Sequence, residues 1–154
     1  MLKVLERQGI FPERIISLQP TAPLIKSTSI EEGIQLHRTS NCDSVCSVAL
    51  VLHNHPYWVK SLDVTTHRLH NFTTVDGDKY LQNQALPVCY TYTGGFYIRK
   101  RNILDKGKGK GLEQDVRGVV LSPNEALDIN YPIDLEYFRY ILEKIKDSQA
   151  VQNQ

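Results

Sequence analysis

The chain has 154 residues, 41% of them hydrophobic, and a formal net charge of +1 at pH 7. A chain of this length usually forms one domain, and its near-neutral charge shows neither the basic excess typical of nucleic-acid binding nor an acidic excess. No apolar run approaches the roughly 20 residues that span a bilayer, and the charged start is unlike a secretory signal. We therefore expect a cytoplasmic protein without a membrane or nucleic-acid partner.

The first half of the chain alternates between helical and strand patterns. Apolar residues spaced among charges predict a helix over residues 2–8. Short apolar runs predict buried strands over residues 14–18 and 44–52, and between them Ser29 and Glu32 form a capping box that opens a second helix. Strand, helix and strand in succession favour a right-handed parallel crossover. We therefore expect a Rossmann-like, three-layer α/β fold with a mostly parallel sheet.

The second half begins with an irregular segment. Residues 53–87 show no helical period and carry apolar side chains that need cover, among them Leu62, Phe72 and Leu81. Further along, the patterns predict a strand over residues 95–99, a helical turn over 100–104, a flexible basic loop over 105–111, strands over 117–121 and 127–130, and a helix over 132–145. We expect one domain over residues 1–147 and a frayed tail over 148–154.

The three cysteines, Cys42, Cys46 and Cys89, are an odd number in a chain that shows no export signal. This pattern predicts reduced thiols rather than disulfides. Cys42 and Cys46 also lack the second ligand pair of a zinc site, so we expect small buried side chains at these positions.

Two prolines hold a polar loop at the end of the first predicted strand. Pro20 and Pro23 fix their own φ angles and keep the preceding residues extended. The Gln19 amide and the Thr21 hydroxyl should therefore stand beyond the strand end, which is where ligands bind in open α/β sheets. The alternative is a rigid turn that only packs its apolar neighbours.

Asp128 and Asn130 are a candidate metal site. They lie two residues apart in a predicted strand, so their side chains should point the same way. Magnesium usually takes one or two carboxylates together with substrate phosphates, and a carbonyl oxygen can join them. The pair is therefore a candidate for holding Mg²⁺. The alternative is that both residues cap the turn into the terminal helix.

Five segments carry a family resemblance when they are taken in order. They are Leu18-Gln19-Pro20-Thr21-Ala22-Pro23-Leu24, Asp43–Val48, His55–Trp58, Leu86–Ile98 and Ala126–Leu135. Together they resemble motifs of the N-acylneuraminate cytidylyltransferases, the enzymes that make CMP-sialic acid and related CMP-nonulosonates. The first segment is similar to that family's Leu-Gln-Pro-Thr-Ser-Pro-Leu-Arg motif, and the last to its Ser-Ile-Asp-Ile-Asp motif. The resemblance covers nearly all of the chain from Leu2 to Leu142.

The resemblance implies a nucleotidyltransferase fold of the GT-A type. It implies transfer of CMP from CTP to a sialic-acid-like nonulosonate, with release of pyrophosphate. It also implies that Asp128 is catalytic and holds Mg²⁺ together with Asn130. By the same resemblance, the substrate-binding residues are Gln19, Thr21, Tyr90, Thr93, Phe96 and Tyr97. A homodimer is implied as well, because residues 53–87 resemble a region that includes an arm crossing to the partner subunit in that family.

The chain also departs from the family. Its members open with a glycine-rich basic loop, Ala-Arg-Xaa-Gly-Ser-Lys, that holds the triphosphate of CTP, and nothing like it occurs here. We therefore expect an N-terminally truncated domain that is inactive in isolation. In addition, Asn130 replaces a second aspartate, and Ala22 and Ile25 replace a serine and an arginine. A non-catalytic remnant that binds a sugar or a partner subunit is the alternative to an enzyme.

Overall fold

The structure is a computed structural model that describes residues 2–105 and 114–152. The chain divides into two compact units. The first unit is made of Met1–Ala49 and Tyr92–Gln154, and the second is Leu50–Thr91.

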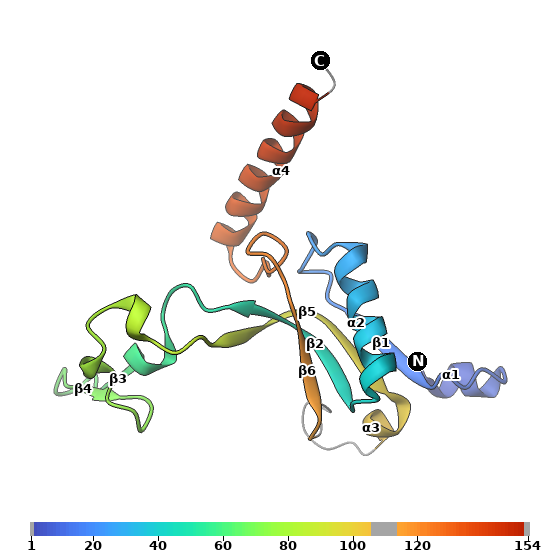
Figure 1. The fold of residues 1–154 in the computed structure, drawn as a ribbon, viewed down its shortest axis with the longest axis horizontal. Helices are drawn as coiled ribbons and strands as arrows, with labels where there is room; N and C mark the ends of the chain where they lie inside the picture. The colour runs from blue at the N-terminus through green and yellow to red at the C-terminus, as the bar shows by residue number, and fades with distance from the viewer. Residues whose placement is uncertain (1, 106–113, 153–154) are drawn as a thin grey trace. The chain divides into compact units, whose positions relative to one another are not determined.

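The chain contains both helices and strands (Figure 1). They are α1 (Leu2–Arg7), β1 (Arg14–Leu18), α2 (Ser27–Ser40), β2 (Ser44–Leu50), β3 (Lys60–Leu62), β4 (Leu69–Asn71), β5 (Tyr90–Lys100), α3 (Arg101–Asp105), β6 (Val116–Val120) and α4 (Pro132–Gln152). Short 3-10 helices cover Pro56–Trp58, Gly77–Lys79 and Asn83–Ala85. The predicted irregular segment, residues 53–87, lies within the second unit. Residues 106–111 of the predicted basic loop lie outside the described residues.

Four strands from both halves of the sequence form one sheet in the order β1-β5-β2-β6. β1 and β5 are antiparallel, with Leu18 opposite Phe96, and β2 and β6 are parallel. β5 also runs antiparallel to β2. Lys100 N donates to Asp43 O (3.2 Å) while Phe96 N donates to Ser47 Oγ (3.0 Å), so the paired residues run in opposite directions along the chain.

The sheet is therefore mixed, which corrects the expectation of a mostly parallel one. The helix α2 does link β1 to β2, and these two strands point the same way. However, β5 lies between them in the sheet. The reason lies in the segment that connects β2 to β5. The first and last residues of this segment lie next to each other, because Val51 N donates to Cys89 O (3.0 Å). A connection that returns to its starting edge brings the next strand back antiparallel.

α2 covers one face of the sheet and buries the core of the first unit. The buried cluster consists of Cys42, Val45, Phe96, Ile98, Val119 and Leu121, against which Ile30, Ile34 and Leu36 of α2 pack. Gly33 allows this close approach, because a Cβ there would lie 2.9 Å from Phe96 Cε2 and 3.0 Å from Ile98 Cδ1. The sheet and α2 form two layers, and a three-layer Rossmann-like arrangement is not confirmed.

Two local predictions are wrong. Ser29 does not cap α2, since the helix begins at Ser27 with no side-chain cap, and Ser29 Oγ instead donates to Glu125 Oε1 (2.7 Å). Residues 127–130, predicted as a strand, are irregular. A carboxylate that is distant in sequence thus decides the orientation of Ser29, and a capping pattern cannot reveal that partner.

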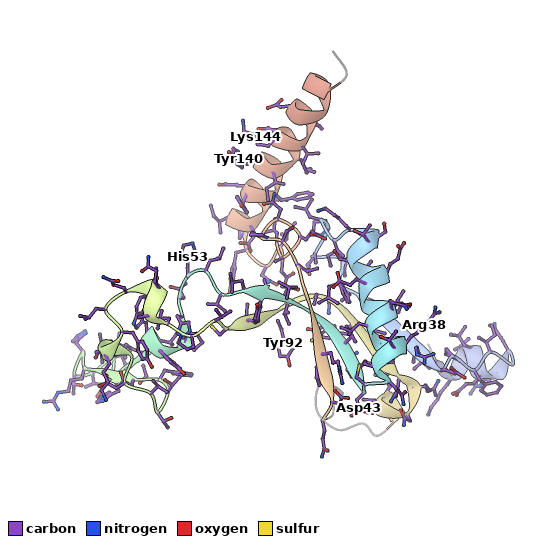
Figure 2. The ribbon with its side chains drawn as sticks, viewed as in Figure 1. Arg38, Asp43, His53, Tyr92, Tyr140 and Lys144 are labelled. Carbon is purple, nitrogen blue, oxygen red and sulfur yellow. The ribbon has the colours of Figure 1, made fainter. Side chains whose placement is uncertain are left out.

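α4 continues to Gln152, beyond residue 145, where the terminal helix is predicted to end. The apolar side chains along α4 are only partly covered. Ile141 is buried, whereas Leu135 and Ile145 are 39% and 42% exposed. Along the same helix, Lys144 Nζ lies 5.7 Å from the centre of the Tyr140 ring (Figure 2). The sequence pattern thus predicted this helix but not how much of its apolar surface is buried.

The second unit is held together by aromatic side chains and a hairpin. Trp58 Nε1 donates to Gly77 O (3.1 Å), and the rings of Tyr57 and Tyr80 lie 5.5 Å apart at a tilt. β3 and β4, which lie between Trp58 and Gly77 in the sequence, pair as an antiparallel hairpin. By contrast, several large apolar side chains of this unit are exposed, namely Leu62, Val64, Leu69, Phe72, Leu81 and Val88.

The described stretches contain no helix long and apolar enough to cross a bilayer. Within the same stretches, no group of three His, Cys, Asp or Glu side chains is arranged to hold a metal ion. Cys42 and Cys46 are buried free thiols and Cys89 is a half-buried one, which agrees with the prediction of reduced cysteines.

Candidate functional site

The loop after β1 is held by backbone hydrogen bonds. Gln19 N donates to Gly95 O (3.0 Å), which extends the pairing of β1 with β5, and Ala22 N donates to Gln19 O (3.1 Å), which closes a turn. Gln19 and Thr21 are both exposed. Their side chains are therefore accessible to a ligand at the end of β1.

The same loop reaches the segment that carries Asp128. Ile129 N donates to Thr21 O (2.8 Å). This backbone hydrogen bond joins two parts of the chain that are far apart in sequence. It brings the loop of Gln19 and Thr21 next to Asp128 and Asn130.

Gly94 lets β5 approach the carboxylate of Asp128 closely. Its φ of +76° lies in the left-handed region, and a Cβ built there would lie 3.3 Å from Asp128 Oδ2. A left-handed conformation costs residues with a side chain roughly 1–2 kcal/mol, a penalty that glycine does not carry. The loop after β1, Gly94 and Asp128 thus meet at the same end of the sheet.

The carboxylate of Asp128 has one oxygen with a hydrogen-bond partner and one without. Oδ2 accepts a hydrogen bond from Asn130 Nδ2 (2.9 Å). Oδ1 is buried and has no partner in the described part of the chain. A buried carboxylate oxygen without a partner is costly. The arrangement therefore suits a hydrogen-bond donor or a cation that would complete it.

Asp134, in the first turn of α4, holds the two residues that precede the helix. Its Oδ2 accepts from Tyr131 N (2.8 Å) and Asn130 N (2.9 Å), and its charge lies in the first turn of the helix, where the helix dipole favours it. The Asp128 carboxylate instead faces the Asn130 side chain. The alternative in which Asp128 and Asn130 cap this turn through their side chains is therefore not what the structure shows.

Of the side chains of Asp128 and Asn130, one presents an oxygen atom that suits magnesium as it stands. Asp128 offers a carboxylate oxygen, and Mg²⁺ is commonly held by one or two carboxylates together with phosphates and water. Asn130 presents its amide nitrogen to the carboxylate. Its oxygen would become a ligand only after the amide turned over, a change that leaves its shape almost the same. Asp128 would thus hold the ion, and Asn130 would join it after that rotation.

Two of the predicted substrate residues are buried beneath the site. Phe96 is fully buried in the core cluster, and Thr93 is 8% exposed. Thr93 Oγ1 donates to Ser47 Oγ (2.7 Å), and Ser47 Oγ accepts from Phe96 N (3.0 Å). These contacts fix the course of β5 next to Gly95. Thr93 and Phe96 therefore support the site from within the fold.

The two remaining predicted residues are Tyr97 and Tyr90. Tyr97 follows Phe96 in β5, so its side chain points to the face of the sheet opposite α2, where the Arg99 guanidinium lies 4.7 Å from its ring centre. Tyr90 is 53% exposed and belongs to the second unit. Among the predicted site residues, the structure brings together Gln19, Thr21, Asp128 and Asn130.

Glu125, which sequence reasoning missed, is a buried carboxylate close to Asp128 in the chain. It accepts hydrogen bonds from Ser29 Oγ (2.7 Å), Ser122 Oγ (2.7 Å) and Lys26 N (3.3 Å). Burial by itself would raise the pKa of Glu125, but these hydrogen bonds and the Lys26 charge lower its pKa to about 2. Glu125 thus clamps the start of α2 to the segment that carries Asp128.

The chain is similar to a CMP-N,N'-diacetyllegionaminic acid synthase from Legionella pneumophila, with 24% identity over 138 residues. The match covers 90% of this chain and 57% of the relative, so the chain spans little more than half of the relative's length. No family model matches the chain. The similarity is distant, and at this coarse level it relates the chain to cytidylyltransferase-like proteins.

Proposed function

We propose that the chain forms part of a sugar nucleotidyltransferase, which transfers CMP from CTP to a sialic-acid-like nonulosonate and releases pyrophosphate. The similarity to a CMP-diacetyllegionaminic acid synthase along 90% of the chain supports this proposal. The observation that carries it is the meeting of residues 19–21, 94–95 and 128–130 at one end of the sheet. They lie in three of the five segments that carry the resemblance to the cytidylyltransferases. A cytoplasmic location is part of the same proposal.

The exposed polar groups have separate roles in this proposal. The Gln19 amide and the Thr21 hydroxyl bind the cytosine and sugar side of the substrates, and Asp128 lies at the phosphates. The anomeric hydroxyl of the sugar attacks the α-phosphorus of CTP, and the bond to the pyrophosphate oxygen breaks without a covalent enzyme intermediate. Mg²⁺ held by Asp128 and Asn130 would neutralise phosphate charge. The chain's own contribution is mainly to position the reacting groups.

A non-catalytic protein is the second candidate, and one observation favours it. Asn130 stands where the resembled family has a second aspartate, and its amide nitrogen donates to Asp128 Oδ2 (2.9 Å). This contact gives one oxygen of the Asp128 carboxylate a hydrogen-bond partner without any ion. Such a protein would bind a sugar or a partner subunit through the same exposed loop.

Pyrophosphate release with CTP, Mg²⁺ and N-acetylneuraminate tests the proposal. We expect none from the 154-residue chain alone, because it has no counterpart of the loop whose backbone donors would cradle the triphosphate. We expect release once a polypeptide that carries an Ala-Arg-Xaa-Gly-Ser-Lys loop is supplied with the chain. Tyrosine fluorescence would report sugar binding in both cases, with N-acetylglucosamine as a control that lacks the carboxylate.

The outcomes of this experiment test both candidates. Pyrophosphate release by the chain alone would contradict the role given to the absent loop. Sugar binding without release from the completed protein would favour the non-catalytic candidate. The absence of both sugar binding and release would contradict both candidates.

We also propose that the chain forms a homodimer through its second unit. Phe72 and Leu81 in this unit are 71% and 90% exposed, and exposed apolar side chains of this size mark interaction surfaces when they cluster. Sedimentation at micromolar concentration should show a species of about twice the 17.6 kDa chain mass. Leu81→Ser should shift the equilibrium towards monomer, whereas Val4→Ser, which changes an exposed valine of α1, should not. A monomer alone at this concentration would count against the dimer.

A further inference from the structure

A basic pocket lies at the opposite end of β1 and β5 from the candidate site. It has a volume of about 430 Å³ and is lined by Glu13, Arg14, Asn41, Lys100, Arg101 and Asn102. Arg14 begins β1 and Lys100 ends β5, whereas Gln19 follows the other end of β1. At roughly 3.3 Å per residue, the pocket and the candidate site are about 16 Å apart along the strand.

Like charges face each other in the basic pocket. Arg14 lies directly opposite Lys100 in the antiparallel pairing of β1 and β5, an arrangement that destabilises a sheet unless something compensates for it. Arg101 adds a third cation. The carboxylate among the lining residues belongs to Glu13, whose side chain is 86% exposed and lies 3.3 Å from Arg14, so this ion pair is weak. The lining therefore carries an excess of positive charge.

A buried histidine holds Arg14 in position. Arg14 Nε donates to His37 Nδ1 (3.2 Å), and His37 is fully buried. The other ring nitrogen, Nε2, lies 3.4 Å from the backbone oxygen of Asp43, which precedes β2 (Figure 2). Burial lowers the pKa of His37, and the charges of Arg14 and Lys100 also lower it, against the effect of the Asp43 acceptor. The ring therefore stays a neutral acceptor, and Arg14 Nη2 remains without a partner among the residues described.

Lys100 keeps hydrogen-bond donors available, and Arg101 is fixed at the edge of the pocket. Lys100 Nζ donates to Asn41 O (2.5 Å), which uses one of the three donors of the ammonium group. Arg101 N donates to Glu13 O (2.8 Å), and the Arg101 guanidinium pairs with Glu6. Two cations opposite each other thus present unused donors to the same space.

We propose that this basic pocket binds a small molecule through a phosphate-type oxyanion. An anion between Arg14 and Lys100 would remove the repulsion across the strands and accept hydrogen bonds from both side chains. The planar fork of arginine matches the spacing of phosphate oxygens. Small-molecule sites typically measure roughly 300–1,000 Å³, so a pocket of about 430 Å³ holds more than the oxyanion alone. The proposal does not depend on the nucleotidyltransferase function.

Titration calorimetry with inorganic phosphate, pyrophosphate and a glycerol phosphate tests this site. Low ionic strength avoids screening, and a chelator excludes divalent ions that could bridge the anions to carboxylates. We expect saturable binding that Arg14→Gln and Lys100→Gln each weaken roughly ten- to a hundredfold, the effect of losing one charge-assisted hydrogen bond. Arg139→Gln, which removes an equal charge from α4, should leave the affinity unchanged. Tighter binding of the glycerol phosphate than of inorganic phosphate would identify a phosphate ester as the ligand. Tighter binding of inorganic phosphate would identify a free phosphate.

Asp128→Ala separates the basic pocket from the candidate site. Anion binding should survive this substitution, and its loss would assign the anion to the candidate site and overturn the proposal. The absence of saturable binding, or an equal weakening in Arg139→Gln, would also overturn it. Arg14→Gln removes the contact with His37 as well. If that variant does not fold, Lys100→Gln decides, with Lys100→Arg expected to restore the affinity.

Discussion

Replacing Glu125 with glutamine is expected to lower the free energy of unfolding by about 3 kcal/mol at neutral pH. The carboxylate accepts hydrogen bonds from the hydroxyls of Ser29 and Ser122, each at 2.7 Å, and from Lys26 N at 3.3 Å. These contacts lower the pKa of Glu125 from 4.5 to about 2, although burial opposes the change. Glutamine keeps the shape of the side chain but has one oxygen and no charge, so it cannot accept all of these hydrogen bonds.

The lowered pKa of Glu125 also fixes how this effect depends on pH. The folded protein holds fewer protons at Glu125 than the unfolded one, so the contribution is complete above the unfolded pKa of 4.5 and is lost as the pH falls towards about 2. The difference in unfolding free energy between wild type and Glu125→Gln should therefore shrink across this range. Hydrogen bonds from Thr66 and Thr65 lower the pKa of Asp63 as well, but that effect is common to both proteins and cancels.

Urea denaturation at a series of pH values measures this difference. Glu143→Gln is the matched control, because Glu143 is exposed on α4 and its substitution should change the unfolding free energy by no more than about 0.5 kcal/mol. A loss in Glu125→Gln as small as that of the control would contradict the role given to the clamp. A difference that stays constant down to the folded pKa would contradict the assigned pKa.

Local sequence patterns were enough to predict most helices and strands. The strand predicted over residues 14–18 has the bounds of β1, and the strand predicted over 117–121 is displaced by one residue from β6. Both are short apolar runs, and the residues that decide their conformation are their immediate neighbours. The helix predicted over residues 132–145 likewise begins where α4 does.

The pairing of the strands could not be predicted in the same way. β5 lies between β1 and β2 because the chain returns from the second unit where Val51 pairs with Cys89. No pattern in the sequence of β5 predicts whether it runs parallel or antiparallel to its neighbours. Alternation along a strand shows that Phe96 and Tyr97 point to opposite faces. Which of the two is buried depends on α2, whose Gly33 packs against Phe96.

The candidate site could be predicted by residue type more readily than by contact. The exposure of the loop after β1 follows from its prolines. Its meeting with Asp128 depends on the hydrogen bond from Ile129 N to Thr21 O, which any residue other than proline could donate. Glu125 did have a local signal, because Ser122 precedes it with the spacing of a capping box. Its other hydroxyl partner, Ser29, lies 96 residues away in the chain, and no local pattern reveals such a partner.

Replacing Asp128 with alanine is expected to abolish the response to magnesium and leave the fold about as stable as before. Asp128 Oδ1 is buried without a partner, and such a group costs roughly 1–3 kcal/mol. Its removal relieves this cost and offsets the loss of the hydrogen bond from Asn130 Nδ2 to Oδ2. Asp134→Ala, which removes the hydrogen bonds from Asn130 N and Tyr131 N at the start of α4, should in contrast cost about 1 kcal/mol.

If Asp128 is catalytic, its substitution should also change activity. This is measured on the chain supplied with a polypeptide that carries the Ala-Arg-Xaa-Gly-Ser-Lys loop. Asp128→Ala should lower the rate of CMP transfer at least about 100-fold, the effect of removing a preorganised electrostatic group from a transition state. Asn130→Asp should leave activity intact or strengthen its dependence on magnesium, because it adds a second carboxylate beside the first. Asp147→Ala is the control, since that carboxylate is exposed on α4.

A magnesium titration followed by tyrosine or tryptophan fluorescence measures the metal response of these variants. Wild type and Asn130→Asp should show saturable curves, with the higher affinity in Asn130→Asp, whereas Asp128→Ala should show none. Identical flat curves for all three proteins would refute the assignment of the metal to Asp128 and Asn130. A loss of stability in Asp128→Ala as large as that in Asp134→Ala would show that Asp128 acts through the fold, because a carboxylate kept for a ligand should not stabilise the protein without it.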